Sequence, residues 1–257
     1  MQSWERAEIS RSRVEAQLTK LETAGRLSER TRLRYERPGA DTVFPLEYAY
    51  HLLGDVRGKR VVDFGCGSGA NSVHIALRGA KLAGLDISES LIALARERLA
   101  ANDVQPTARF VAGSAHDLPF QSASVDVVFG IAILHHLDLR LVAPEVHRIL
   151  KPGGRAIFQE PVRNSALLQF IRNLIPYRAP DISPFERPLR DAELVEFGQS
   201  FSSMKVRAFT TPFVKLALLI PRLRRNGDWW YAFDDRMLRR FPVLGSSATI
   251  RVIELTK

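Results

Sequence analysis

The stretch VVDFGCGSGAN, residues 61–71, joins an apolar run to three closely spaced glycines. A strand that carries Asp63 near its end and continues through Gly65, Gly67 and Gly69 into a helix brings bare backbone close to a ligand, because glycine has no Cβ to clash with it. The stretch therefore predicts a strand, a tight turn and a helix that together bind a nucleotide-like cofactor.

Four further apolar runs follow the glycine turn, and helical segments alternate with them. Short runs of this kind are typical of strands buried on both faces of a parallel sheet. Repeated β-α-β units of this length predict an α/β fold with a doubly wound sheet. We expect strands at 60–65, 81–87, 108–113, 125–130 and 155–160, and helices at 70–77, 89–102 and 143–150.

The chain divides into three parts of one integrated domain. Residues 1–57 are largely polar and helix-forming, which predicts a helical N-terminal preface. Residues 58–161 form the cofactor-binding core. Residues 162–257 supply the remainder of the sheet, with a helix at 190–201, strands at 204–211 and 248–257, and helical lid insertions at about 162–190 and 212–246.

Composition narrows the class of protein. The 257 residues are 46% hydrophobic, enough for one well-packed domain, and 37 Lys and Arg outnumber 28 Asp and Glu. The basic balance permits an acidic partner, but no nucleic-acid motif accompanies it, so nucleic acid is not expected. A single cysteine and no metal-ligand spacing indicate neither disulfides nor a metal site. With no segment like a signal peptide and no run long enough to cross a bilayer, we expect a cytoplasmic protein.

The glycine turn by itself fits two classes of cofactor. The letters GCGSGA at 65–70 also satisfy the dinucleotide pattern, and Asp86 lies at about the ~20-residue spacing of a ribose-binding acid. An NAD-dependent oxidoreductase therefore stays open beside other nucleotide-like ligands. A turn that binds no ligand is the remaining alternative.

Five motifs in order resemble the class I S-adenosylmethionine-dependent methyltransferases, especially their small-molecule and quinone-type branch. The acid before the glycines is a feature that dehydrogenase fingerprints usually lack. The resemblance implies a Rossmann-like fold and methyl transfer from S-adenosylmethionine. It rests on VVDFGCGSG at 61–69, GLDIS at 84–88, GSAHDLPF at 113–120, VDVVFGIAILHHLD at 125–138 and EVHRILKPGGRAIFQEP at 145–161.

The resemblance also implies a cofactor site. Gly65, Gly67 and Gly69 would line the methionine half, and Asp63 would lie near its ammonium group. Asp86 would accept hydrogen bonds from the two ribose hydroxyls, and Ile87 would pack on the adenine.

In two regions the sequence is compatible with more than one role for the candidate cofactor-binding residues. Relatives usually place an aspartate after the glycine of the third motif, whereas this chain has Ser114 and Ala115. The hydroxyl of Ser114 would accept from the adenine amino group, with Asp117 either taking over that role or lying exposed in a turn. Tyr35 and Phe44, ahead of the glycine turn, either close over the cofactor or pack in the protein.

Methyl transfer needs a catalytic base only if the acceptor must lose a proton. His135 follows the fourth strand at the expected mouth of the active site and is the stronger candidate, since the family pattern lets His136 pack locally. Glu160 ends the fifth strand and either faces the acceptor or pairs with an arginine such as Arg163.

The two insertions bear on the acceptor. Residues 212–246 join apolar side chains to arginines and aromatic residues, which suits either a lipophilic acceptor pocket with transient contact to an anionic membrane or a simple cover for the sheet edge. We therefore expect methylation of a small, lipophilic molecule. The alternatives are the NAD-dependent oxidoreductase and a non-catalytic cofactor-binding module.

Overall fold

The computed structural model describes residue 9 and residues 26–104, 108–164 and 187–257. The expected helix before residue 26 and the insertion at 165–186 thus lie largely outside the described residues. The helices are α2 (Glu29–Glu36), α3 (Pro45–Leu53), α4 (Ala70–Leu77), α5 (Glu89–Ala101), α6 (Leu139–Ile149), α8 (Asp191–Gly198), α9 (Pro212–Leu219), α10 (Pro221–Arg224) and α11 (Gly227–Arg240), with 3-10 turns η1 (Leu134–His136) and η2 (Pro242–Ser247).

Seven strands form one sheet in the order β3-β2-β1-β4-β5-β7-β6. The first five pair in parallel, and β7 pairs antiparallel with both of its neighbours. The direction of winding reverses between β1 and β4, which makes the sheet doubly wound as expected. The strands are β1 (Arg60–Phe64), β2 (Lys81–Asp86), β3 (Arg109–Ala112), β4 (Val125–Ile131), β5 (Leu150–Pro161), β6 (Ser203–Phe209) and β7 (Ile250–Thr256).

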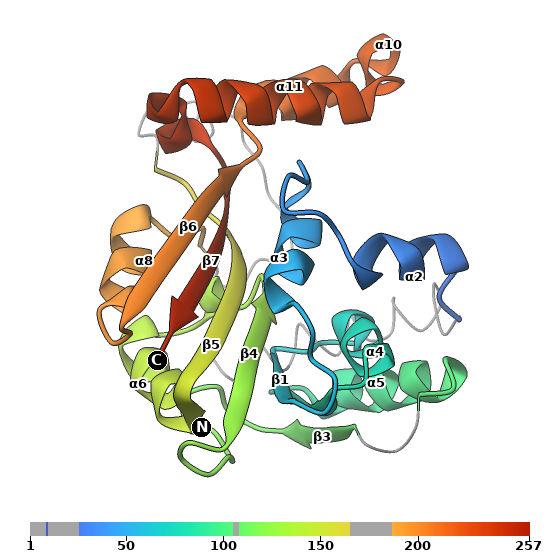
Figure 1. The fold of residues 1–257 in the computed structure, drawn as a ribbon, viewed down its shortest axis with the longest axis vertical. Coiled ribbons are helices and arrows are strands. Elements are labelled where there is room, and N and C mark those ends of the chain that lie inside the picture. The colour runs from blue at the N-terminus through green and yellow to red at the C-terminus, as the bar shows by residue number, and fades with distance from the viewer. Residues whose placement is uncertain (1–8, 10–25, 105–107, 165–186) are drawn as a thin grey trace.

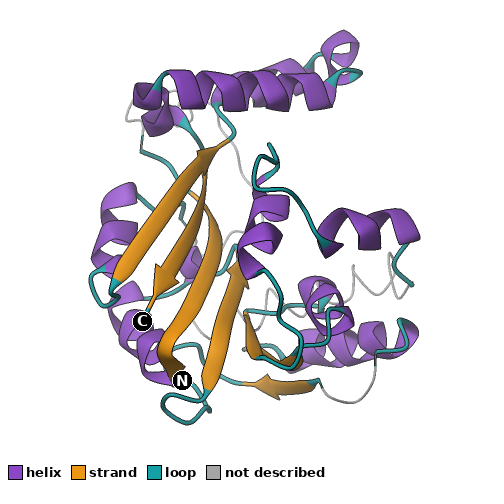
Figure 2. Cartoon of the chain, viewed as in Figure 1, coloured by secondary structure: helices purple, strands orange, loops and turns teal. Residues whose placement is uncertain are grey.

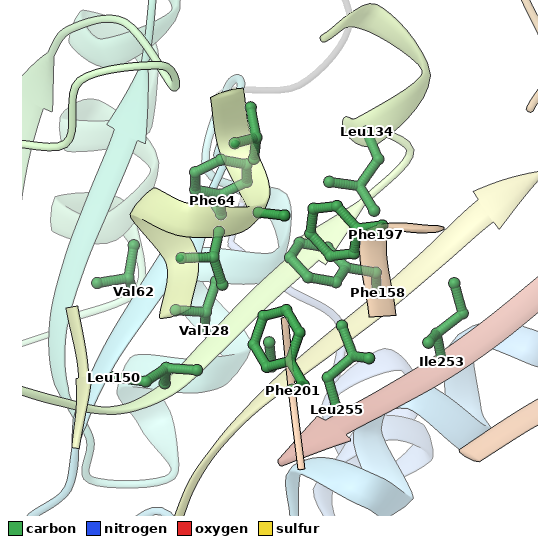
Figure 3. Close-up of a cluster of buried hydrophobic side chains, with 14 of the residues drawn as sticks. Val62, Phe64, Val128, Leu134, Leu150, Phe158, Phe197, Phe201, Ile253 and Leu255 are labelled. Atoms are coloured by element: carbon green, nitrogen blue, oxygen red, sulfur yellow. The ribbon is translucent and has the colours of Figure 1, made fainter. Parts of the chain in front are cut away.

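Helices cover both faces of the sheet. Consecutive strand residues point to opposite faces, so Val62 packs in a core with α6 and α8 while Val61 packs in a second core with α3, α4 and α5. Figures 1 and 2 show these two groups of helices on either side of the strands. In the first core, Phe158 meets Phe197 edge-on with ring centroids 5.7 Å apart (Figure 3).

The observed elements follow the sequence pattern closely, except that α6 starts early and β5 begins at Leu150, five residues before the expected start of that strand. Ser88 caps α5 as its pattern predicts, with the backbone N–H of Leu91 donating to the hydroxyl. Helix α6 begins at Leu139, four residues before the expected start, because the Asp138 carboxylate caps it. Pro144 favours the first turn of a helix, yet here it lies inside α6. The domain boundaries at 57 and 161 stay predictions.

The insertion between β6 and β7 forms a separate helical layer. Helices α9, α10 and α11 with η2 lie across one end of the molecule, beyond β6 and β7 (Figure 1). No described helix is both long and apolar enough to cross a membrane.

Candidate functional site

A cavity of about 330 Å³ opens where β1, β2 and β4 end. This is the switch point of the sheet, the place where doubly wound folds bind ligands, and the volume suits a small molecule. Its walls come from the glycine turn, the end of β2 and the segment after β4. They are Gly65, Cys66, Gly67, Ser68, Ala70, Leu85, Asp86, Ile87, Leu91, Gly113, Ala115, Ile131, Ala132, Ile133, His136 and Leu137.

The three glycines of the turn have different local roles. All three have positive φ. A Cβ on Gly65 would lie 2.5 Å from Ile133, and one on Gly69 would lie 2.8 Å from Ala95, so these two glycines permit close packing. A Cβ on Gly67 would meet no protein atom within 4 Å. Gly67 therefore leaves open space beside its backbone, as a cradle for a ligand requires, whereas Gly69 does not line the cavity and serves the contact between α4 and α5.

Asp86 joins the two sides of the cavity. One carboxylate oxygen accepts from the backbone N–H of Gly67 and the other from that of Ser88, each at 2.9 Å. These bonds fix the carboxylate at the end of β2, and a carboxylate oxygen is able to accept from more than one donor. Gly67 and Asp86 together thus fit a ribose-bearing cofactor.

Asp63 lies beneath the cavity and not in its wall. Its carboxyl is buried and accepts from the Ser72 hydroxyl at 2.5 Å. Burial raises its pKa to about 7, and the nearby charge of Asp86 adds to the shift. Cys66 does line the cavity, but burial raises the pKa of its thiol far above its ordinary range, so it is a packing residue in the thiol form.

Ala115 of the third motif and Ile87 of the second motif both line the cavity. The hydroxyl of Ser114 accepts from the backbone N–H of His116 at 3.3 Å within the same turn, and its contact with the adenine stays a prediction. Asp117 is exposed and outside the cavity wall, which agrees with the turn-residue alternative.

Tyr35 and Phe44 pack against other aromatic rings. Tyr35 packs against the rings of Tyr50 and His74 at centroid distances of 5.0 and 5.1 Å. Phe44 packs against Tyr231 at 5.1 Å. Among the described residues, the cavity wall therefore contains neither of them, and both follow the packing alternative.

His135 and Glu160 form a buried pair beside the cavity. One Glu160 oxygen accepts from the backbone N–H groups of Ile133 and Leu134 at 2.9 and 2.8 Å, and the other lies 2.9 Å from Nδ1 of His135. Because a carboxylate only accepts, Nδ1 carries the hydrogen and Nε2 is left as the basic nitrogen. Glu160 has no exposed surface, so it supports His135 and the turn after β4 and does not face an acceptor.

A groove of about 710 Å³ adjoins the cavity between η1, α6 and α8. His136 and Leu137 line both spaces, whereas His135 lines the groove. The ring of His136 lies 4.0 Å from that of His135, centroid to centroid. Both histidines thus lie at the junction, including the one that the sequence pattern assigned to local packing.

Several wall residues were missed by the sequence reasoning. Ala132 and Ile133 are apolar and carry no chemical signature, so only their place directly after β4 at the switch point marks them. Ala132 has a φ of +55°, a strained conformation that is concentrated at functional sites. No group of three or more metal-binding side chains occurs in the parts of the chain that the structure describes.

Comparison with known proteins identifies the class. Residues 62–158 match the methyltransferase domain family. An O-methyltransferase from Aspergillus nomiae is 37% identical over 40% of this chain and 47% of its own length. A ubiquinone biosynthesis O-methyltransferase from Pseudomonas syringae is 35% identical over 52% of this chain and 61% of its own length. The chain thus spans about half of the curated relatives that it matches.

The solved structures agree on the fold. A phosphoethanolamine N-methyltransferase from Haemonchus contortus in complex with S-adenosyl-L-methionine superposes with a TM-score of 0.57 at 19% identity, over 90% of this chain and 57% of the other. The chain contains a class I S-adenosylmethionine-dependent methyltransferase domain, which confirms the resemblance found in the motifs.

Proposed function

We propose that the protein transfers the methyl group of S-adenosylmethionine to a small, lipophilic acceptor. The observation that carries the proposal is the cavity at the switch point, where the open backbone of Gly67 faces the carboxylate of Asp86. Bound S-adenosylmethionine supplies an activated methyl group on a positive sulfur. The residues of the chain contribute binding, alignment and a site shielded from water.

His135 is the base in this proposal. Its Nδ1–H is held by Glu160, which orients the ring, and Nε2 is the atom that would take a proton from a hydroxyl, amine or acidic carbon. Glu160 is a positioning residue, because it also holds the backbone of Ile133 and Leu134. The acceptor would meet the cofactor where the groove joins the cavity, at His136 and Leu137.

The lipophilic character of the acceptor is supported by apolar side chains that line the groove, among them Leu137, Leu139 and Leu189. The similarity to a ubiquinone biosynthesis enzyme supports it as well. The proposal also includes a cytoplasmic protein that works at a membrane surface, since lipophilic molecules partition into bilayers.

Titration calorimetry with S-adenosylmethionine and with NAD tests the cofactor. We expect S-adenosylmethionine to bind and Asp86→Ala to weaken binding by about 1–3 kcal/mol, as for the loss of a charged hydrogen-bond partner. Asp55→Ala is the matched control, because Asp55 is exposed and accepts from the backbone N–H of Arg57 in a turn away from the cavity wall. Binding of NAD without S-adenosylmethionine would overturn the proposal in favour of an oxidoreductase.

Methyl transfer from radiolabelled cofactor into lipid extracts tests the reaction. We expect His135→Ala to lower turnover about 10²–10⁴-fold, the usual contribution of a general base, with cofactor affinity nearly unchanged. Glu160→Gln should shift the pH profile of turnover, since an amide holds the ring without the charge. Absence of any labelled product would favour a non-catalytic binding module.

A further inference from the structure

Helices α9, α10 and α11 have an unusual distribution of polar and apolar side chains. On α9, Phe213 and Leu216 are exposed, and Leu219 at its end is 77% exposed. Among the described residues, eight of the thirteen exposed large hydrophobic side chains lie between Phe213 and Val243. Among the described residues, the walls of the cavity and of the groove contain no side chain from this expected lid. Its exposed apolar side chains therefore do not face the proposed acceptor site.

Helix α11 contacts the rest of the protein through two aspartates as well as through the ring of Tyr231. Asp234 is buried and accepts from the backbone N–H and hydroxyl of Thr211. Asp235 pairs with Arg207 at 2.8 Å. A surface helix normally buries its apolar stripe and exposes its charges. In α11, by contrast, Asp234 is buried and Asp235 is half-buried against Arg207, while large apolar side chains on another face are exposed.

The outer face of α11 carries aromatic rings followed by arginines. Trp229 and Phe233 are exposed, one helical turn apart, and their rings stack with centroids 5.4 Å apart. Arg236 and Arg240 continue the same face at helical spacing and are also exposed. Stacked aromatic rings beside arginines suit the boundary between lipid headgroups and acyl chains.

The positive charge of this helical layer indicates which kind of partner it binds. Residues 212–247 contain seven basic side chains and three acidic ones. Of the acidic residues, Asp234 is buried on Thr211 and Asp235 pairs with Arg207 and Arg239, which leaves Asp228 as the exposed carboxylate of this segment. The arginines of α10, Arg222 and Arg224, are exposed beside the apolar end of α9. A positive, apolar surface of this kind complements an anionic bilayer.

We propose that the layer formed by α9, α10 and α11 docks the protein on an anionic lipid membrane, with Phe213, Leu219 and Trp229 entering the interface and the arginines contacting lipid phosphates. This names the membrane partner of the proposed function. The docking itself needs neither cofactor nor acceptor, so the two proposals can fail separately.

Flotation of the full chain with vesicles tests the docking in the absence of cofactor. We expect at least about tenfold stronger binding to an equal mixture of phosphatidylcholine and phosphatidylglycerol than to phosphatidylcholine alone, and weaker binding at high salt. Leu219→Glu and the double variant Arg224→Glu/Arg225→Glu should each reduce binding at least about tenfold.

Two matched controls carry the same changes elsewhere. Val195→Glu replaces an exposed valine on α8, and Arg30→Glu/Lys81→Glu reverses two exposed charges on α2 and β2. Both should bind vesicles as the unaltered chain does. Failure to bind anionic vesicles, or equal losses in the controls, would overturn the proposal. A dimer that Leu219→Glu dissociates, without vesicle binding, would show that a second copy covers the surface instead.

Discussion

The cofactor end of the sheet and the helical layer of α9–α11 differ in which side chains they bury and which they expose. At the cofactor end, apolar side chains fill two cores and the buried carboxylate of Glu160 organises the turn after β4. In the layer, the buried carboxylate of Asp234 holds Thr211 while Trp229, Phe233 and other apolar side chains are exposed. The first region is thus built around its own core, whereas the second leaves apolar side chains exposed, as the proposed docking surface requires.

Removing the Glu160 carboxylate should have the largest effect. Glu160→Ala leaves two backbone N–H groups and the His135 ring without their buried acceptor, and we expect a loss of about 3–5 kcal/mol in the free energy of unfolding. Urea unfolding measures this. Glu160→Gln keeps an acceptor oxygen and should cost less. A loss below about 1 kcal/mol for the alanine variant would contradict the organising role of this carboxylate.

The next effect concerns pH. Because burial raises the folded pKa of Asp63 to about 7, folding favours the protonated carboxyl, and this contribution to stability is full below the ordinary pKa near 4 and lost as the pH rises to about 7. Between about pH 4 and pH 7, we expect the free energy of unfolding of the unaltered chain to fall by a few kcal/mol relative to that of Asp63→Asn. Denaturant unfolding at several pH values measures the difference, and parallel curves would contradict the assignment.

A smaller effect separates backbone strain from close packing. Gly65 and Gly153 have nearly equal φ angles, +72° and +70°, but only at Gly65 would a Cβ meet a neighbour. Gly153→Ala should cost about 1–2 kcal/mol for the left-handed conformation alone. Gly65→Ala should add about 1–3 kcal/mol for the contact with Ile133. Equal unfolding free energies for the two variants would show that Ile133 moves aside without cost.

The smallest global effect is expected in the helical layer. Asp234→Ala removes the acceptor of Thr211, which should loosen α11 while changing the free energy of global unfolding by less than about 1 kcal/mol. Limited tryptic digestion should cleave after the arginines of α10 and α11 several-fold faster. If the whole protein unfolds with the layer, the two regions form one cooperative unit and the contrast between them does not hold.

The sequence predicted the parallel part of the sheet well, because buried strands and glycine turns are local patterns. The strand from Arg60 to Phe64 and the helix from Ala70 to Leu77 agree with the expected ranges almost residue for residue. The antiparallel insertion of β7 between β5 and β6 was not foreseen, since strand order depends on contacts distant in the sequence.

The site was predicted where a residue has its own chemistry and missed where geometry decides. Asp86 and Gly67 line the cavity as expected. Tyr35 was assigned to the cofactor from its position before the glycine turn, but α2 holds it against α3 and α4. The exposure of Trp229 could not be predicted either, because the pattern of apolar residues does not show which face of a helix packs on the protein.

Ile133 links the cofactor site to the histidine site. A Cβ on Gly65 would meet its side chain, its backbone N–H donates to Glu160, and Glu160 in turn holds Nδ1 of His135. The glycine turn and the imidazole ring therefore share one supporting residue. A substitution at Ile133 alters the support of both.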